Sequence, residues 1–412
     1  MLEETEQLID SEMTILNEGD VASPQGFVAG GLHVGLRREK NDFGWLYSSV
    51  PANCAAVYTQ NAFKAAPLLV TEESINLEHK LSAVVINSAI ANACTGERGL
   101  EDAKQTQSWV ASKLHIPEHE IAVASTGLIG EFLPMDKISF GVDNINIYNE
   151  SQSESFNEAI LTTDTKTKHI AVEVEIDNKI VTVGGTCKGS GMIHPNMATM
   201  LGFMTTDANV GVDDLNYLLK GSVDDTFNMI TVDGDTSTND MVILLANGES
   251  KSTMLTQSHP DWEKFATAVK YVSEYLAKSI ARDGEGATKL IKANVIGAQT
   301  KEQNNIIAKK IVGSSLVKTA LHGCDPNFGR IVASIGYGDQ AVNPNDINVW
   351  LCGHLLVKNG MINDYDELDL KAKMEQDTIE IHAVVGDTEH QSTAYGCDLS
   401  YDYVKINALY RT

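Results

Sequence analysis

A threonine near the middle of the chain follows a glycine-rich stretch and opens an apolar segment. The stretch reads Lys188-Gly-Ser-Gly-Met-Ile-His-Pro-Asn-Met-Ala198, and Thr199 precedes the apolar run 200–204. If the Thr199 hydroxyl attacks the Ala198 carbonyl, the peptide shifts to an ester, and hydrolysis frees an N-terminal threonine. Its α-amine, with an ordinary pKa of about 7.7–8.0, can then serve as general base for its own hydroxyl. These residues could support self-cleavage and acyl transfer, although threonine is also common at strand starts.

Four other residues carry groups that acyl transfer needs. Thr126 and Gly127 follow an apolar strand pattern, and a glycine N–H at such a point can donate to an oxyanion. Lys188 could hold a carboxylate, and Glu285, between two glycines, suits an ammonium group. The alternatives are an ordinary strand-to-turn glycine at 127 and solvated surface charges at 188 and 285.

Apolar periodicity predicts the elements that would position these groups. It predicts strands over 81–87, 121–125, 241–246 and 378–384, and the first of these should be buried on both faces. It predicts helices over 100–114, 213–220 and 262–280. Strict alternation over 171–176, a turn at Asp177-Asn178 and a returning segment over 180–183 predict a hairpin with one solvated face. A cut before Thr199 leaves two domain-sized pieces, 1–198 and 199–412, each with mixed elements. We therefore predict a layered α/β architecture.

Composition narrows the class of protein. The chain has 412 residues, 43% hydrophobic and 21% charged, with a formal net charge of −25. So acidic a chain argues against binding nucleic acid or anionic membranes. Its six cysteines have spacings of neither a disulfide framework nor a metal site, so we expect no metal. The acidic N-terminus has no signal-peptide pattern and no apolar run is long enough to span a bilayer, which favours the cytoplasm.

Several short blocks fall in a recognisable order along the chain. They are 64–67, 92–96, 125–130, 162–165, 283–286, 325–330 and 403–408, arranged around the fourteen-residue segment 188–201. Together they resemble the ornithine acetyltransferase family of arginine biosynthesis (glutamate N-acetyltransferase). The resemblance implies an ArgJ/DmpA-like fold, with mixed sheets sandwiched between helices in two lobes. It also implies cleavage into an alpha chain, 1–198, and a beta chain, 199–412.

The same resemblance implies an activity and a set of site residues. A self-cleaving enzyme would transfer acetyl from N2-acetylornithine to glutamate through an acetyl ester on Thr199, with Thr126 and Gly127 as the oxyanion hole. The implied substrate-binding residues are Thr162, Thr163, Lys188, Thr199, Glu285, Asn407 and Thr412, with the choice between the first two open. No cofactor is implied, use of acetyl-CoA as a second acetyl donor stays open, and the expected assembly is a heterotetramer of two alpha and two beta chains.

Two other patterns are weaker, and two positions depart from the family. His194 lies five residues before Thr199, but the family motif does not rely on a histidine there. The run 231–240 mimics part of a calcium loop, yet Leu244 stands where the loop needs its final glutamate. Ala89 and Ile90 stand where the family pattern has glycine and asparagine.

Two rival functions remain. A self-processing aminopeptidase of similar fold would use water as the acyl acceptor and would not depend on glutamate. An uncleaved acidic scaffold protein would run as one intact band on a denaturing gel.

Overall fold

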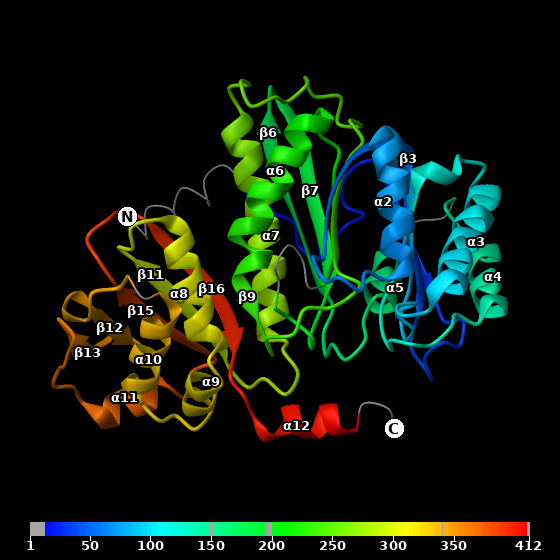
Figure 1. The fold of residues 1–412 in the computed structure, drawn as a ribbon. Helices are drawn as coiled ribbons and strands as arrows, with labels where there is room; N and C mark the ends of the chain where they lie inside the picture. Colours follow the sequence, from blue (N-terminus) through cyan, green and yellow to red (C-terminus); the bar gives the residue numbers. More distant parts are fainter. Residues whose placement is uncertain (1–12, 149–150, 195–199, 340, 410–412) are drawn as a thin grey trace. The chain divides into compact units, whose positions relative to one another are not determined.

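The computed structural model describes residues 13–148, 151–194, 200–339 and 341–409. The chain divides into two compact units (Figure 1). The first unit takes in Met1–Gly189, Asn196–Phe227 and Thr236–Leu276, and the second takes in Ser190–Pro195, Asn228–Asp235 and Ala277–Thr412.

The first unit is built on one mixed sheet. Its strand order is β1 (Met13–Ile15), β6 (Lys168–Ile176), β7 (Lys179–Lys188), β8 (Leu201–Thr206), β10 (Met241–Ala246), β3 (Phe43–Tyr58), β4 (Lys80–Asn87) and β5 (Ile121–Ser125), with β2 (Phe27–Leu32) also paired to β3. The pairs β8–β10 and β4–β5 are parallel. The remaining neighbours are antiparallel.

Helices bury both faces of this sheet. They are α2 (Ala66–Glu78), α3 (Gly96–Leu114), α4 (Met135–Asp143), α5 (Ser153–Ala159), α6 (Val212–Asp225) and α7 (Trp262–Arg282), the last of which continues into the second unit. Successive residues of β4 alternate between two cores. Ile86 packs in a cluster with Phe156 of α5, whereas Val85 packs in another with Val110 of α3. The prediction that 81–87 is a strand buried on both faces is confirmed.

The second unit has its own mixed sheet and core. The strand order is β14 (Met361–Ile362), β13 (His354–Lys358), β12 (Asn348–Leu351), β15 (Thr378–Val384), β11 (Leu290–Ile296), β16 (Gln391–Cys397) and β9 (Ile230–Thr231). Its helices are α8 (Lys301–Gly313), α9 (Ser315–His322), α10 (Phe328–Gly338), α11 (Glu367–Lys373) and α12 (Tyr401–Ala408). Alternate residues of β11 and β15 share one core with Ile307 and Ile311 of α8, as period-two strands packed on an amphipathic helix should.

The predicted mixed α/β class is confirmed. The strands 121–125, 241–246 and 378–384 are β5, β10 and β15, and the three predicted helices are α3, α6 and α7. The hairpin 171–183 exists as β6–β7, but the expected solvated face is wrong for β7, which is buried from Val181 onward. Helix α7 is the cause, because a side chain on Gly185 would press against Val272 and Leu276. Among the described residues, no helix has both the length and the apolar character to cross a membrane.

Candidate active site

The predicted oxyanion residues lie in a loop that leaves β5 and runs beside a second loop. The Leu128 amide donates to the Ala89 carbonyl at 2.9 Å, and the Ala91 amide donates to the Leu128 carbonyl at 2.9 Å. Gly127 has φ of 129°, and a Cβ there would overlap the backbone of Ala89. Only glycine fits this close approach of two backbones. Thr126 is buried directly before it.

Two donors in this loop have no acceptor among the described residues. The Thr126 amide is used, because it donates to the Asn87 carbonyl at 3.0 Å. Within the described ranges, however, neither the Gly127 N–H nor the Thr126 hydroxyl is hydrogen-bonded. A backbone N–H and a hydroxyl on adjacent residues, both held rigidly, are the kind of pair that stabilises an oxyanion.

Asn239, which was not predicted as a site residue, holds both loops. The Asn239 side-chain amide donates to the Ala91 carbonyl at 2.6 Å and to the Ser125 carbonyl at 2.8 Å. Ala89, where the family pattern has glycine, has φ of 75°, a left-handed conformation that glycine adopts at little cost. Although alanine replaces the glycine of the family pattern at position 89, the backbone there keeps the left-handed conformation that glycine favours.

Lys188 lies at the end of β7 and is buried, which contradicts the alternative of a solvated surface lysine. Among the described residues, no acceptor lies within hydrogen-bonding distance of its ammonium group. Asp164 and Asp240 attract this ammonium group through space, but a buried ammonium that donates no hydrogen bond to an anion still costs free energy unless a ligand supplies one. Lys188 is therefore suited to hold a ligand carboxylate.

Asp164, which the sequence analysis did not single out, joins two predicted binding segments. One carboxylate oxygen accepts from Lys168 Nζ at 2.7 Å and from the Gly189 amide at 2.6 Å, and the other accepts from the Thr162 amide at 2.9 Å. Burial opposes ionisation of Asp164, but Lys168 and Lys188 outweigh it and hold the pKa of the carboxyl well below its usual range. The carboxylate thus fixes the Thr162 segment against the turn that follows Lys188.

Thr162 and Thr163 are both half-buried. The Arg37 guanidinium donates to the carbonyls of Leu161 and Thr162 at 3.0 and 3.2 Å. The Thr162 backbone is therefore fixed from both sides, by Arg37 and Asp164. The choice between the two hydroxyls stays open.

In the second unit, Glu285 and Asn407 come together. The Asn407 side-chain amide donates to Glu285 Oε2 at 2.7 Å, and the Glu285 backbone amide donates to the Ser190 carbonyl at 3.0 Å. A Cβ on Gly191 would overlap the Glu285 carboxylate, so this carboxylate lies directly on the Gly191 backbone. Glu285 is 7% exposed, which contradicts the alternative of a solvated loop carboxylate.

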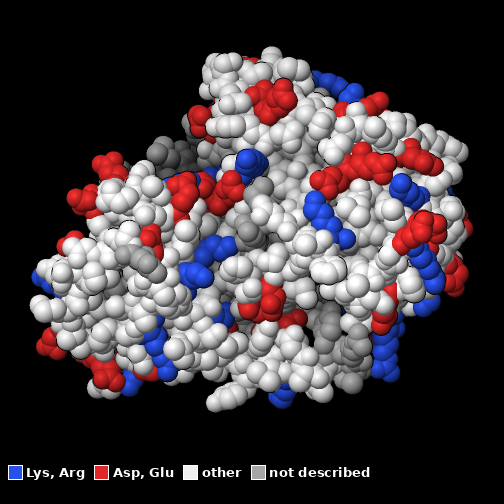
Figure 2. Space-filling model, viewed as in Figure 1, with Lys and Arg blue, Asp and Glu red and all other residues white. Residues whose placement is uncertain are grey.

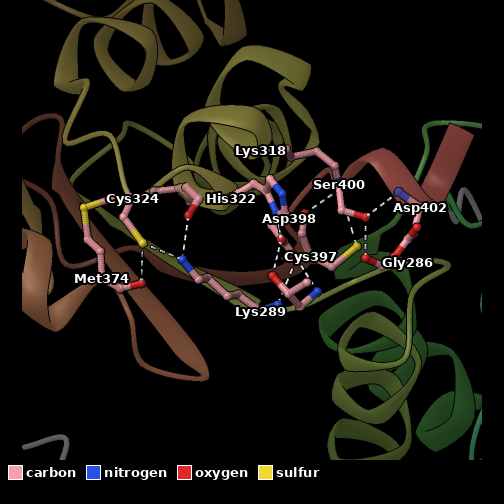
Figure 3. A network of polar contacts seen from close by, with 12 residues as sticks. Gly286, Lys289, Lys318, His322, Cys324, Met374, Cys397, Asp398, Ser400 and Asp402 are labelled. Atoms are coloured by element: carbon pink, nitrogen blue, oxygen red, sulfur yellow. Dashed lines mark hydrogen bonds and ion pairs between the residues drawn. The ribbon is translucent and has the colours of Figure 1, made fainter.

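A polar network fastens the loop that carries Glu285 (Figure 3). Asp398 accepts from the backbone amides of Thr288 and Lys289, both at 2.8 Å, and from the Thr288 hydroxyl at 2.6 Å. His322 Nδ1 lies 2.7 Å from the same carboxylate. Burial acts against ionisation of Asp398, yet these hydrogen bonds lower its pKa. The loop is therefore fixed by a buried carboxylate at its far end.

The same network reaches α12, which carries Asn407. The Ser400 hydroxyl donates to the Gly286 carbonyl at 2.6 Å and accepts from the Asp402 amide at 3.2 Å, which caps the helix. Ser400 thus ties the start of α12 to the residue after Glu285. Both sides of the Glu285–Asn407 pair are held in place independently of that hydrogen bond.

The remaining predicted residues, Ala198, Thr199 and Thr412, lie outside the described residues. His194 Nδ1 is 3.0 Å from the Thr231 hydroxyl. Burial, followed by Lys309 and Lys310, lowers the His194 pKa to about 4, so its imidazole is neutral near pH 7. In the part of the chain that the structure describes, no group of three or more His, Cys, Asp or Glu side chains could hold a metal ion.

The surface charge is mixed on the face drawn in Figure 2. Acidic and basic side chains are interspersed there, and Lys and Arg form no broad patch on that face. The net charge of −25 gives the whole chain a negative field. Such a field weakly favours the approach of cationic ligands over distances of about 8 Å at physiological salt.

Comparison with known proteins identifies the family. The model of the ArgJ family matches residues 28–412. The chain belongs to the ArgJ family. The arginine biosynthesis bifunctional protein ArgJ of Staphylococcus saprophyticus is 57% identical over 98% of this chain and 98% of its own length. The protein of the same name from Oceanobacillus iheyensis is 53% identical over 97% of this chain and 98% of its own.

Two solved structures are also similar to parts of the chain. The arginine biosynthesis bifunctional protein from Bacillus halodurans has 53% identity and a TM-score of 0.44, covering 45% of this chain and 98% of the other. An ornithine acetyltransferase from Mycobacterium tuberculosis, crystallised with ornithine, has 36% identity and a TM-score of 0.42, covering 45% and 100%. Because these TM-scores are low, the family assignment rests on the matches along the sequence. The resemblance predicted from the blocks is confirmed, and this ArgJ chain is an acetyltransferase of arginine biosynthesis.

Proposed function

We propose that this ArgJ-family chain cleaves itself between Ala198 and Thr199 and then transfers acetyl from N2-acetylornithine to glutamate. The products are ornithine and N-acetylglutamate. The observation that carries the proposal is the pair of unused donors on Thr126 and Gly127, in a loop where only glycine fits. The glycine-rich segment that ends at Thr199 supplies the nucleophile.

The proposed transfer proceeds in two balanced halves. The Thr199 hydroxyl attacks the acetyl carbonyl, and its own α-amine takes the proton. The Gly127 N–H and the Thr126 hydroxyl donate to the oxyanion that forms. The C–N bond then breaks, the amine leaves with that proton, and the acetyl group remains on Thr199 as an ester. In the second half, the glutamate amine attacks the ester carbonyl and gives a proton to the Thr199 α-amine. The C–O bond then breaks, and that proton passes to Thr199 Oγ, which regenerates the hydroxyl.

Binding roles follow from charge. Lys188, buried and without an acceptor among the described residues, is proposed to hold the substrate α-carboxylate. Glu285, buried beside Asn407, is proposed to hold the amino end of ornithine. Thr162 or Thr163 and the terminal Thr412 are proposed as further polar contacts.

Three further features belong to this proposal. The chain itself supplies nucleophile, base and oxyanion donors, so the proposed reaction uses no metal or cofactor. The relatives are named bifunctional, and we extend this to a second acetyl donor, acetyl-CoA. The assembly is proposed to contain two copies of each fragment, 1–198 and 199–412, acting in the cytoplasm.

A denaturing gel and two assays test the function. Purified protein should give two fragments, the second beginning with Thr199 by N-terminal sequencing. Turnover of N2-acetylornithine should require glutamate, and replacing this donor with acetyl-CoA measures the second activity. An intact band of 44.7 kDa would overturn the proposal in favour of the scaffold protein. Glutamate-independent hydrolysis would favour the aminopeptidase.

Replacing Gly191 with alanine should displace the Glu285 carboxylate. The new methyl group would occupy the place of that carboxylate and break its hydrogen bond with Asn407. Losing one partner of a buried charge pair typically costs about 2–5 kcal/mol of binding free energy. We therefore expect the affinity for ornithine, measured by calorimetry, to fall at least about tenfold. Gly221→Ala is the matched control, because nothing lies within 4 Å of the added group. Equal ornithine affinity in the two variants would remove Glu285 from the binding role.

A further inference from the structure

The run 231–240, which mimics a calcium loop, places one of its carboxylates on backbone amides. Asp233 Oδ2 accepts from the Met192 amide at 2.6 Å, and Oδ1 accepts from the Ile193 amide at 2.9 Å. The Asp235 amide also donates to Oδ1, at 3.2 Å. The two oxygens therefore hold two consecutive amides of a segment that ends only five residues before Ala198.

The backbone that Asp233 holds is in an unfavourable conformation. Met192 has φ of 55°, in the left-handed region that residues other than glycine rarely adopt. Its side chain is 42% exposed, so apolar packing is a poor explanation for this geometry. Such a conformation persists where surrounding contacts over-determine it. The paired hydrogen bonds to Asp233 are contacts of that kind.

Neighbouring contacts fix the same segment on both sides. The Ser190 hydroxyl donates to the Asp283 carbonyl at 2.7 Å. The Ile193 carbonyl accepts from the Val232 amide at 2.7 Å and from the Thr231 hydroxyl at 3.2 Å. Residues 190–194 form neither helix nor strand, yet the second unit holds them from one end to the other.

We propose that Asp233 is a positioning residue for self-cleavage, which holds the strained Met192–Ile193 backbone and so fixes the chain that leads to the Ala198–Thr199 bond. This inference rests on the proposed self-cleavage. Attack by a hydroxyl on the preceding carbonyl depends steeply on geometry, so a fixed anchor five residues before Ala198 should raise the rate of cleavage. Asp233 belongs to the fragment 199–412 and the held amides to 1–198, so the contact joins the two fragments.

The chemistry of the contact requires a carboxylate. Two N–H donors need two acceptor oxygens, and an ionised carboxylate supplies them in one plane. In Asp233→Asn, one oxygen becomes an NH₂ group that faces a backbone N–H and cannot accept. The nearby Asp235 is exposed, and among the described residues its side chain accepts no hydrogen bond. Asp235→Asn therefore makes the same chemical change in the same loop without removing the anchor.

The experiment follows cleavage of full-length chains during cell-free synthesis, by pulse-chase and a denaturing gel. Because misplacement of reacting groups by about 1 Å can cost on the order of 100-fold, we expect Asp233→Asn to form the two fragments at least about tenfold more slowly than the wild type. Asp235→Asn should cleave at the wild-type rate. The two Asp233→Asn fragments should migrate on the gel with the wild-type fragments, because the cleaved bond is still the one between 198 and 199.

A second measurement separates positioning from folding. Cleavage is repeated with Asp233→Glu, which keeps the charge but moves the carboxylate by one methylene. Melting temperatures are compared for Thr199→Ala alone and for Thr199→Ala combined with Asp233→Asn or with Asp233→Glu. Slow cleavage by either Asp233 variant that melts like its parent supports the inference. Wild-type cleavage rates in both Asp233 variants would overturn it. A wild-type chain that stays intact would instead overturn the proposed self-cleavage itself.

Discussion

Thr199→Ala should accumulate as one chain of 44.7 kDa and show no acetyl transfer. The substitution removes the only hydroxyl that can attack the Ala198 carbonyl in the proposed reaction, so neither the new N-terminus nor the acetyl ester can form. Removing a covalent nucleophile lowers kcat by up to on the order of 10⁶-fold. Intact mass spectrometry and a glutamate-dependent assay on the same preparation measure both effects.

The conservative replacement is the control for that result. Thr199→Ser keeps the hydroxyl and should still yield two fragments, with a serine at the start of the second. If the alanine variant were cut at 198–199 as efficiently as the wild type, another group would have to be the nucleophile for processing. Acetyl transfer by an uncut alanine variant would likewise contradict the ester mechanism.

Asp164→Ala should lower the free energy of unfolding by about 3–5 kcal/mol, the usual cost of removing one partner of a buried ion pair. The Asp164 and Lys168 side chains are 0% and 2% exposed and meet at 2.7 Å. Without Asp164, the Lys168 ammonium stays buried and the amides of Thr162 and Gly189 lose their acceptor. Urea unfolding monitored by circular dichroism, on chains that also carry Thr199→Ala, measures the change without interference from cleavage.

An exposed ion pair and the pH dependence of unfolding test whether the buried ion pair is the cause of the lost stability. Glu367 and Lys371 have the same four-residue spacing and meet at 2.6 Å, but both are about half exposed. Glu367→Ala should therefore leave stability essentially unchanged. Because the folded-state pKa of Asp164 is depressed, its contribution is present above the unfolded pKa of about 3.9 and is lost as pH falls towards the folded value. The difference between parent and Asp164→Ala should shrink below about pH 4, and a constant difference would contradict the assignment.

Much of the fold could be predicted from the sequence because its strands and helices are strongly periodic. The bounds of β5, β10 and β15 agree with the predicted ranges, and α7 begins at the predicted Trp262. The solvated face of β7 was predicted wrongly because the hairpin pattern, an alternating strand followed by a turn, carries no information about a helix from a distant part of the sequence. Gly184 and Gly185 were informative in retrospect, because a strand glycine often marks a close approach by another element.

The candidate site was predictable only where a family block contains the functional residue. Asp164 lies inside such a block, but its role depends on Gly189, twenty-five residues away. Asn239 reaches Ser125 and Ala91 across separations of 114 and 148 residues. Local periodicity and spacing carry no information about hydrogen bonds at such distances. A polar residue inside an otherwise unexplained run, such as 231–240, was the available signal for both Asn239 and Asp233.

The strand order of the first sheet has a consequence for the lifetime of a cleaved enzyme. Strands β8 and β10, from 199–412, lie between β7 and β3, from 1–198, with six paired residues along each boundary. An intact chain assembles this interleaved sheet in a unimolecular reaction, whereas a cut chain that unfolds must find its partner by diffusion. Refolding yield would then depend on concentration, and separated fragments would expose unpaired strand edges. The functional half-life of the cleaved enzyme would then depend on its rate of unfolding, that is, on its kinetic stability.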